Sequence, residues 1–340
     1  MKKLLYVLIF LPLIGFGQQT LNKSIIHDNL QRDYIIHIPS TYNTNTPIPL
    51  VFCFHGYTSS ASTIMSYSMF NTVSDTADFI IIYPQGTLLQ GSTHWNVGGW
   101  TTSSTTDDVG FISSLLDSIS NAYNIDDKRV YSTGMSNGGY MSFLLACQLS
   151  NRIAAIASVT GSMTPQTYNA CNPQHPTPIL QIHATNDQTV PYVGDPTWTK
   201  SINDVLQYWV AYNNCNTSAT TTAIADINIF DGSTVEHIVY AGGNNYVSTE
   251  HFKISGGGHD WPGSWGNMDI HASAEVWKFF SRYDINGLIS TITSINDKTI
   301  NDKRLVKITD ILGKEVTLKN NTLLFYIYDD GTVKKKIIIE

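Results

Sequence analysis

The chain has few charged residues. They make up 14% of its 340 residues, against 42% hydrophobic residues, a composition that excludes an intrinsically disordered protein. The formal net charge is −7 and no basic stripe interrupts it. A protein of this charge is not suited to bind nucleic acid or an anionic membrane surface. We therefore expect a neutral substrate.

Long apolar runs are also missing after the first residues. No later segment approaches 18 consecutive apolar residues, so we expect no membrane span in the mature protein. The apolar run 4–16 follows two lysines and ends near the small residues Gly15 and Gly17. This is typical of a signal peptide, residues 1–17, and predicts a secreted or cell-surface protein. A membrane anchor is the alternative.

Cysteine is scarce as well, with four residues and none in the CxxC spacing of a metal or redox site. Export makes disulfides possible. Cys53 lies in an apolar run and Cys147 in a segment of helical period, so both are expected to be buried. Cys171 and Cys215 stand in loop-like surroundings rich in Asn, Pro and Thr. We therefore predict one disulfide, Cys171–Cys215.

Short apolar runs alternate with segments of helical period from residue 34 to residue 280. This pattern predicts an α/β fold with a mostly parallel sheet covered by helices. The predicted strands are 34–38, 50–54, 79–83, 130–133, 153–159, 179–183 and 250–254. The predicted helices are 109–123, 139–149, 201–212 and 273–283.

The composition changes after Asp284 to Ser, Thr, Asn, Asp and Lys around short alternating runs. We place a domain boundary near Asn286, with the main domain at 18–285 and a small β module at 286–340. The predicted strands of the module, which has a turn at Asp329-Asp330-Gly331, are 305–308, 323–328 and 333–339.

A candidate nucleophile stands in Gly134-Met135-Ser136-Asn137-Gly138, which matches the pattern G-x-S-x-G. The pattern follows a predicted strand and precedes a predicted helix, as it does in an α/β-hydrolase fold. Such a turn strains the backbone of the serine and exposes its hydroxyl, while the glycines avoid collisions between strand and helix. A glycine-rich turn with an idle serine is the alternative.

A serine hydroxyl needs a histidine to take its proton and a carboxylate to orient that histidine. In α/β hydrolases these follow in the order Ser, Asp, His. Asp187 comes just after the predicted strand 179–183, and His259 stands in a glycine-rich loop after 250–254. We therefore predict Ser136, Asp187 and His259 as the catalytic residues. The competing side chains are His251, His271, Asp195 and Asp260.

The surroundings of Ser136 suggest further roles. The backbone N–H groups of Tyr57 and Asn137 are predicted to form the oxyanion hole, and His55 is interpreted as a packing histidine that supports the loop. Asp107 and Asp108 are interpreted as caps of the following helix. An aromatic wall for a sugar or phenolic group is predicted from tryptophans in the expected active-site loops, namely Trp95, Trp100, Trp261 and Trp265.

The main domain resembles the secreted esterases of the polyhydroxybutyrate depolymerase-like and feruloyl or acetylxylan esterase-like type. The resemblance covers roughly residues 29–283 and is carried by 54–56, 83–86, 95–96, 107–111, 129–139, 187–192 and 256–263. It implies the same nucleophile, acid and base, and it also favours Cys171–Cys215. Tyr57 is a departure, because many depolymerase members have a cysteine at that position.

The tail resembles the C-terminal sorting domain of the type IX secretion system of Bacteroidetes. Residues 310–315 and 325–333 carry this likeness, although the usual opening Tyr-Pro-Asn-Pro strand is missing. The resemblance implies that the type IX machinery exports the protein, with cleavage or surface attachment of the tail.

These observations predict a serine carboxylic-ester hydrolase that works through an acyl-enzyme, with no metal and no organic cofactor. The expected substrates are feruloyl or acetyl esters of plant polysaccharide, and short polyesters such as polyhydroxybutyrate are the second candidate. A non-catalytic surface binding protein on a hydrolase scaffold is the alternative from another class.

Overall fold

The computed structural model describes residues 18–289, 305–309, 314, 316, 323–328 and 333–337. The chain divides into two compact units, residues 1–289 and 290–340, which are described separately here. The signal peptide predicted for residues 1–17 lies outside the described residues.

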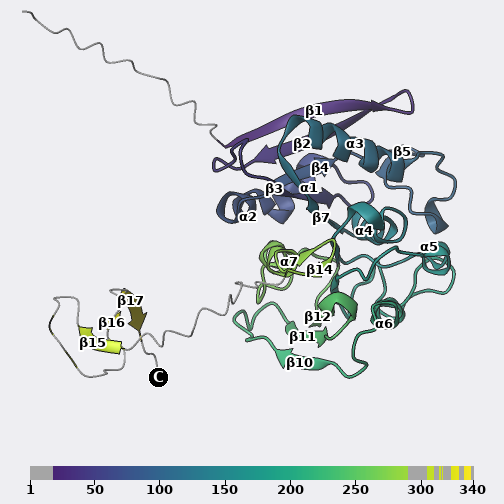
Figure 1. Ribbon diagram of the computed structural model, residues 1–340. Helices are drawn as coiled ribbons and strands as arrows, with labels where there is room; N and C mark the ends of the chain where they lie inside the picture. Colours follow the sequence, from purple (N-terminus) through teal and green to yellow (C-terminus); the bar gives the residue numbers. More distant parts are fainter. Residues whose placement is uncertain are drawn as a thin grey trace, which may run out of the picture. The chain divides into compact units, whose positions relative to one another are not determined.

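A ten-stranded sheet forms the centre of the first unit (Figure 1). Its strands are, in spatial order, β1 (Gln19–His27), β2 (Leu30–Ile38), β4 (Ile80–Pro84), β3 (Ile48–Phe54), β7 (Ile125–Met135), β8 (Ala155–Val159), β9 (Ile179–Ala184), β12 (Thr249–Ser255), β11 (Thr234–Tyr240) and β10 (Thr220–Ala223). The strands from β4 to β12 run parallel. The two strands at each edge pair antiparallel.

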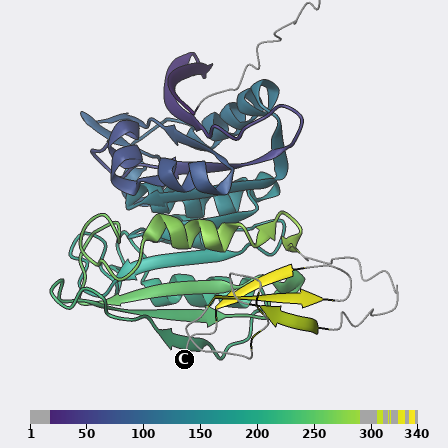
Figure 2. The same cartoon turned by 90° about the vertical axis from the view of Figure 1, so that its left-hand side faces the viewer.

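Helices cover both faces of this sheet (Figures 1 and 2). One face is covered by α3 (Asp108–Ala122), α4 (Asn137–Gln148), α5 (Pro165–Ala170) and α6 (Ile202–Tyr212). The other is covered by α1 (Ala61–Ser68), α2 (Phe70–Ala77) and α7 (Ala272–Phe280). The strands alternate between two cores, since Phe52 and Phe54 point to the first and Val51 and Cys53 to the second. Both faces of the central strands are therefore buried, as parallel sheets require.

Short elements fill the connections. They are the hairpin β5 (Thr87–Leu89) and β6 (Ser92–His94), the 3-10 helices η1 (Gly99–Thr101), η2 (Ser150–Arg152) and η3 (Asn244–Tyr246), and the pair β13 (Tyr283–Asp284) and β14 (Gly287–Leu288). The hairpin and η1 lie in the segment 84–106, for which no regular structure was predicted.

The predicted central strands and long helices are present, but the edge strands β1, β10 and β11 were missed. β10 is exposed along its whole length and β1 is at most half-buried, so neither shows a buried alternating pattern. The short helices α1 and α2 were missed because serine and threonine interrupt their apolar face.

The predicted disulfide Cys171–Cys215 is wrong. The structure joins Cys147 to Cys171, whose Cα atoms are 4.7 Å apart. Cys147 lies in the last turn of α4 and Cys171 directly follows α5, so the bridge connects two neighbouring helix ends. Cys215 is buried beside the Thr249 hydroxyl. Expected burial of Cys147 was a poor reason to exclude it, because a disulfide is apolar and is readily buried.

The second unit contains an antiparallel sheet of β15 (Leu305–Thr309), β16 (Leu323–Tyr328) and β17 (Val333–Ile337), with β16 in the centre. These are the three strands predicted for the tail. The turn predicted at residues 329–331 lies outside the described residues. Within the described parts of the two units, no helix has the length and apolar character needed to cross a membrane.

Candidate active site

Ser136 lies in a sharp turn between β7 and α4. Its backbone angles, φ 54° and ψ −121°, lie in a region that residues with a side chain rarely adopt. The Ser136 N–H donates to the Val159 carbonyl of β8 (2.9 Å), and its carbonyl accepts from Tyr140 N in the first turn of α4 (3.0 Å). The hydroxyl is thus presented at the carboxyl end of β7, in the strained conformation predicted from the motif.

Two glycines allow this turn to form. A Cβ atom added at Gly134 would lie 2.6 Å from the Gly138 carbonyl carbon, and one added at Gly138 would overlap the Phe54 carbonyl oxygen. Strand β3, strand β7 and helix α4 therefore approach one another at a distance that no side chain at these positions would permit.

The Asp187 carboxylate lies in a turn just after β9. Its Oδ1 accepts from the backbone N–H groups of Thr189 and Val190, both at 2.8 Å, and its side chain is fully buried. Two backbone donors hold the carboxylate in one orientation, which leaves Oδ2 for another partner.

That partner is His259, in the loop after β12. His259 Nδ1 lies 2.7 Å from Asp187 Oδ2. Burial by itself raises the pKa of Asp187, but the hydrogen bond from His259 and the Val190 N–H outweigh it and hold the pKa below its usual value. An ionised carboxylate accepts the Nδ1 proton, so the lone pair of the neutral imidazole is on Nε2. This is the tautomer that takes a proton from an alcohol.

The structure places all three predicted catalytic residues after the carboxyl ends of parallel strands, in the order β7, β9 and β12. The Asp187 and His259 side chains are in direct contact. Within residues 18–289 the only hydrogen bond of His259 is the one to Asp187, so its Nε2 has no hydrogen-bond partner among these residues.

The competing side chains lie elsewhere. Asp195 is bonded to the N–H and hydroxyl of Thr197, and His271 caps α7. His251 is buried in β12, where it contacts Tyr192 and the Gln181 carbonyl. Asp260 is next to His259, but its pKa is raised by burial. A carboxylate whose ionised form is disfavoured by burial is less suited to orient an imidazole.

The predicted oxyanion hole has two backbone donors near Ser136. Gly56, which precedes Tyr57, is close to the nucleophile, since a Cβ added there would lie 4.0 Å from Ser136 Oγ. Asn137 is the first residue of α4, where helix N–H groups lack internal acceptors. Within the described residues no hydrogen bond uses the N–H of Tyr57 or of Asn137.

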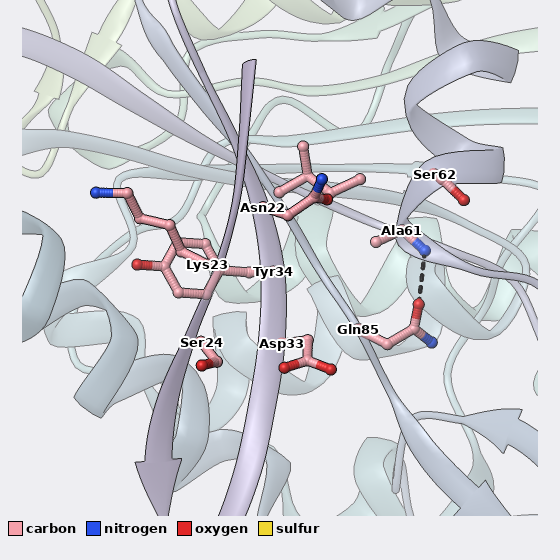
Figure 3. Close-up of a pocket in the computed structure, with 9 residues that line it drawn as sticks. Asn22, Lys23, Ser24, Asp33, Tyr34, Ala61, Ser62 and Gln85 are labelled. Atoms are coloured by element: carbon pink, nitrogen blue, oxygen red, sulfur yellow. Dashed lines mark hydrogen bonds between the residues drawn. The ribbon is translucent and has the colours of Figure 1, made fainter. Parts of the chain in front are cut away.

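His55 supports the loop that carries Tyr57. It is buried, its Nδ1 donates to Gly56 O (2.7 Å), and its Nε2 accepts from Gly86 N (2.9 Å). Burial lowers the pKa of His55 to about 4, so the ring is neutral. Gln85 donates to the same Nε2 (3.2 Å) and accepts from Ala61 N (2.9 Å) at the wall of a surface hollow between β1, β2 and α1 (Figure 3). His55 therefore has the packing role that was interpreted for it.

The predicted aromatic wall is wrong for Trp95 and Trp261, because both indoles are completely buried. Trp95 Nε1 donates to the His55 carbonyl (3.0 Å), and the backbone of Trp95 exchanges two hydrogen bonds with the Asn137 side chain. Trp261 Nε1 donates to Ser273 Oγ (3.1 Å). The prediction assumed that tryptophans in loops are exposed at the active site. These two instead pack into the core and anchor their loops to it.

The other two tryptophans are more accessible. Trp100 is half-buried, and its ring packs edge-on against Tyr57, with centroids 5.6 Å apart. Trp265 is 69% exposed and stands a few residues after His259. The structure therefore leaves Trp100 and Trp265 as candidates for substrate contact.

The two aspartates at the start of α3 have different partners. Asp107 caps the helix through Gly110 N (2.8 Å), as interpreted from the sequence. Asp108 is buried and pairs with Arg32 at 2.6 Å. In the described part of the chain, one group of three side chains could hold a metal ion, namely His27, Asp28 and Asp107. His27 Nε2 lies 3.6 Å from each carboxylate, which is an ordinary ion-pair distance.

The comparisons with known proteins agree with this geometry. A family model described as "Esterase PHB depolymerase" matches residues 33–174. A bifunctional acetylxylan esterase/xylanase of Neocallimastix patriciarum is 28% identical over 274 residues, 80% of this chain and 36% of that protein. Feruloyl esterase D of Neurospora crassa is 26% identical over 289 residues, 79% of this chain and 89% of that protein.

Among solved structures, an acetyl xylan esterase from Aspergillus awamori superposes with a TM-score of 0.57 at 16% identity, over 77% of this chain and 99% of that one. The fold is that of an α/β hydrolase. The prediction of fold class is thereby confirmed. The chain spans about a third of the length of the Neocallimastix protein, so the resemblance to that relative concerns one part of it.

Proposed function

We propose that this chain is a serine carboxylic-ester hydrolase, with Ser136 as nucleophile, His259 as general base and Asp187 as the residue that orients the base. The observation that supports it most is the 2.7 Å hydrogen bond between His259 Nδ1 and the Asp187 carboxylate. This carboxylate is buried and accepts two further hydrogen bonds from backbone N–H groups. This pair follows two neighbouring strands of the sheet whose β7 ends in the strained serine turn.

In the proposed reaction, His259 Nε2 takes the hydroxyl proton as Ser136 Oγ attacks the ester carbonyl. The negative charge on the carbonyl oxygen is stabilised by the N–H groups of Tyr57 and Asn137 and by the N-terminus of α4. The alcohol leaves with the proton from His259, and an acyl-enzyme remains on Ser136. Water then attacks the acyl-enzyme, with His259 again taking the proton, and the acid is released from Ser136.

The proposed substrates are acetyl or feruloyl esters of plant polysaccharide. The names of the relatives support this class, since they include an acetylxylan esterase/xylanase and a feruloyl esterase. Trp100 and Trp265 are proposed to contact the sugar or phenolic group. Short polyesters are the second candidate, favoured by the depolymerase family model that matches residues 33–174.

The first experiment compares the wild type with Ser136→Ala on p-nitrophenyl acetate. We expect the rate to fall by several orders of magnitude, because the nucleophile is removed and only binding and the oxyanion donors remain. Ser62→Ala, which changes an exposed serine of α1, is the control and is expected to match the wild type. Unchanged activity of Ser136→Ala would refute the assignment.

A serine-directed phosphonate separates the enzyme from a binding protein on the same scaffold. It is expected to label the wild type at Ser136 and to leave Ser136→Ala unmodified. An unlabelled wild type would favour the binding protein. Rates on methyl ferulate, acetylated xylan and hydroxybutyrate oligomers, measured side by side, then rank the substrate classes.

The protein is further proposed to be secreted or attached to the cell surface through the type IX machinery. The disulfide Cys147–Cys171 supports an oxidising compartment. The likeness of the tail residues to a sorting domain supports export by the type IX machinery. Detection of the protein in the medium of the wild-type cells, and its retention in cells that make a chain ending at residue 289, would test this.

A further inference from the structure

Asp187 contacts a second imidazole besides that of His259. His183, near the carboxyl end of β9, is completely buried, and its Nε2 lies 3.4 Å from Asp187 Oδ2. The same Nε2 lies 2.9 Å from the Val190 carbonyl. Two histidine nitrogens therefore lie near Oδ2, one from β9 and one from the loop after β12.

The hydrogen-bond partners of His183 decide which of its nitrogens carries the proton. Gln181 Nε2 donates to the Gly161 carbonyl (2.9 Å), which determines how the Gln181 amide is oriented. The same Nε2 lies 3.0 Å from His183 Nδ1, so Nδ1 accepts. The proton of the neutral ring is then on Nε2, which donates to the Val190 carbonyl and lies 3.4 Å from Asp187 Oδ2.

This chain of contacts returns to the nucleophile. Gly161 follows β8 and lies against the serine turn, since a Cβ added there would be 2.8 Å from the Ser136 carbonyl oxygen. Two buried hydrogen bonds therefore connect Gly161, which packs against the Ser136 turn, through Gln181 to His183, and His183 in turn lies beside Asp187. All of the side chains in this path are buried.

We propose that His183 is a positioning residue that holds the Asp187 turn and its carboxylate for His259, and that Gln181 sets the tautomer in which His183 does so. The inference rests on the proposed function, which it deepens by adding a buried second histidine to the acid–base pair. His183 touches no reacting atom and acts through Asp187.

The charged and titratable groups around this pair are few. Asp260 and Tyr140 face Asp187 and His259 from the neighbouring loop and from α4. Tyr192 and His251 lie on the far side of His183, where the rings of His183 and Tyr192 are 5.9 Å apart and Tyr192 Oη lies 2.9 Å from His251 Nε2. Burial lowers the pKa of His183 to about 4, so it donates as a neutral ring throughout the working range.

The test compares His183→Leu, which removes the donor, with His183→Gln, which keeps an N–H near the position of Nε2. His251→Leu is the matched control, because it removes a buried imidazole of the neighbouring strand that does not contact Asp187. On p-nitrophenyl acetate we expect kcat to fall about tenfold in His183→Leu with little change in KM. His183→Gln is expected to recover most of this loss.

The pH profile separates positioning from a general loss of stability. Without the His183 Nε2–H dipole 3.4 Å from Oδ2, the Asp187 carboxylate is more basic and holds the His259 imidazolium more tightly. The acid limb of kcat/KM therefore moves to higher pH in His183→Leu and stays in place in His251→Leu, even if both melt earlier. Gln181→Leu is expected to shift the limb in the same direction, and it serves as the second variant if His183→Leu does not fold.

The NMR signal of the His259 Nδ1 proton, which lies in the 2.7 Å hydrogen bond to Asp187, gives a readout that needs no ester hydrolysis. It is expected to move to lower field in His183→Leu and Gln181→Leu relative to the wild type, because a more basic carboxylate strengthens that hydrogen bond. An acid limb and an Nδ1 proton signal that equal those of His251→Leu, with kcat within about twofold of the wild type, would overturn the inference and leave the proposed function intact. A wild type without esterase activity would instead refute the proposed function, and the Nδ1 proton signal would still decide the role of His183.

Discussion

The turn of Ser136 and the loops of Asp187 and His259 belong to the same sheet but are held in different ways. Around Ser136 the backbone itself is the constraint, because Gly134 and Gly138 leave no room for a Cβ atom between β3, β7 and α4. Around Asp187 and His259 the constraint is a set of hydrogen bonds from residues of several segments. Packing defines the proposed nucleophile, and polar contacts define the proposed acid and base.

This difference explains which half of the site a short motif reveals. The steric constraint restricts residue type at fixed positions around the serine, even though part of the collision is with Phe54 of β3, and it therefore appears as a fixed pattern of glycines. A hydrogen-bond constraint accepts many residue types and sequence separations, so it leaves no comparable pattern. The predictions below test each half in turn.

The largest effect is expected at the acid. Asp187→Asn keeps an acceptor for Thr189 and Val190 but no longer stabilises the tautomer and the imidazolium of His259, so kcat is expected to fall by about 10⁴. Asp260→Asn, beside the same histidine, is the control and should cost less than tenfold. Equal losses of kcat in the two variants, measured on p-nitrophenyl acetate, would contradict the assignment of Asp187 as the residue that orients His259.

A methyl group at the serine turn is the next test. Gly138→Ala places a Cβ onto the Phe54 carbonyl, so the free energy of unfolding should fall by about 4 kcal/mol or the chain should not fold. Gly91→Asn is the control, since Gly91 has open space around it and asparagine tolerates its positive φ. Denaturant unfolding compares the two. A stable, active Gly138→Ala would show that packing does not define this turn.

The disulfide joins the end of α4, the helix that begins after Ser136, to the end of α5. Replacing both Cys147 and Cys171 by alanine is expected to cost about 3 kcal/mol, because it releases a cross-link over a separation of 24 residues. Cys215→Ala removes only a buried thiol and should cost about 1 kcal/mol. If Cys215→Ala were as costly as the double variant in thermal unfolding, the pairing described here would be incorrect.

The loss of stability at acid pH is the smallest expected effect, and it tests the buried histidines. Burial lowers the pKa of His55 and His183 to about 4 and that of His251 to about 3, below their usual value of 6.5. The unfolded chain then binds more protons than the folded one, so stability is complete above pH 6.5 and falls as the pH drops from 6.5 toward 4. The free energy of unfolding should be about 2 kcal/mol lower at pH 6 than at pH 7. Equal stability at both values would contradict neutral, buried rings.

Much of the fold followed from patterns that are local in the chain. The buried parallel strands are continuous apolar runs, and α3 and α6 have apolar residues at helical spacing. β10 and β1 do not, because an edge strand needs no buried face. The glycine-flanked serine was recognisable because the positions that it restricts lie within five consecutive residues.

Other features depend on distances that no local pattern contains. Trp95 and Trp261 stand in loops, yet they are buried because the loops turn back onto the core. The partner of Cys171 was chosen by loop character, whereas the structure pairs it by the proximity of two helix ends. His183 was read as a strand residue only, since its contact with Asp187 depends on how the turn after β9 closes.

The sequence alone therefore determined the fold class, the serine turn and the order of the candidate catalytic residues, because hydrophobic periodicity and the glycine positions of the turn are readable from consecutive residues. The tertiary structure alone decided which cysteines pair, which tryptophans are buried and which histidine lies beside Asp187. Those outcomes depend on contacts between segments far apart in the chain, and such contacts exist only once the sheet has brought the segments together.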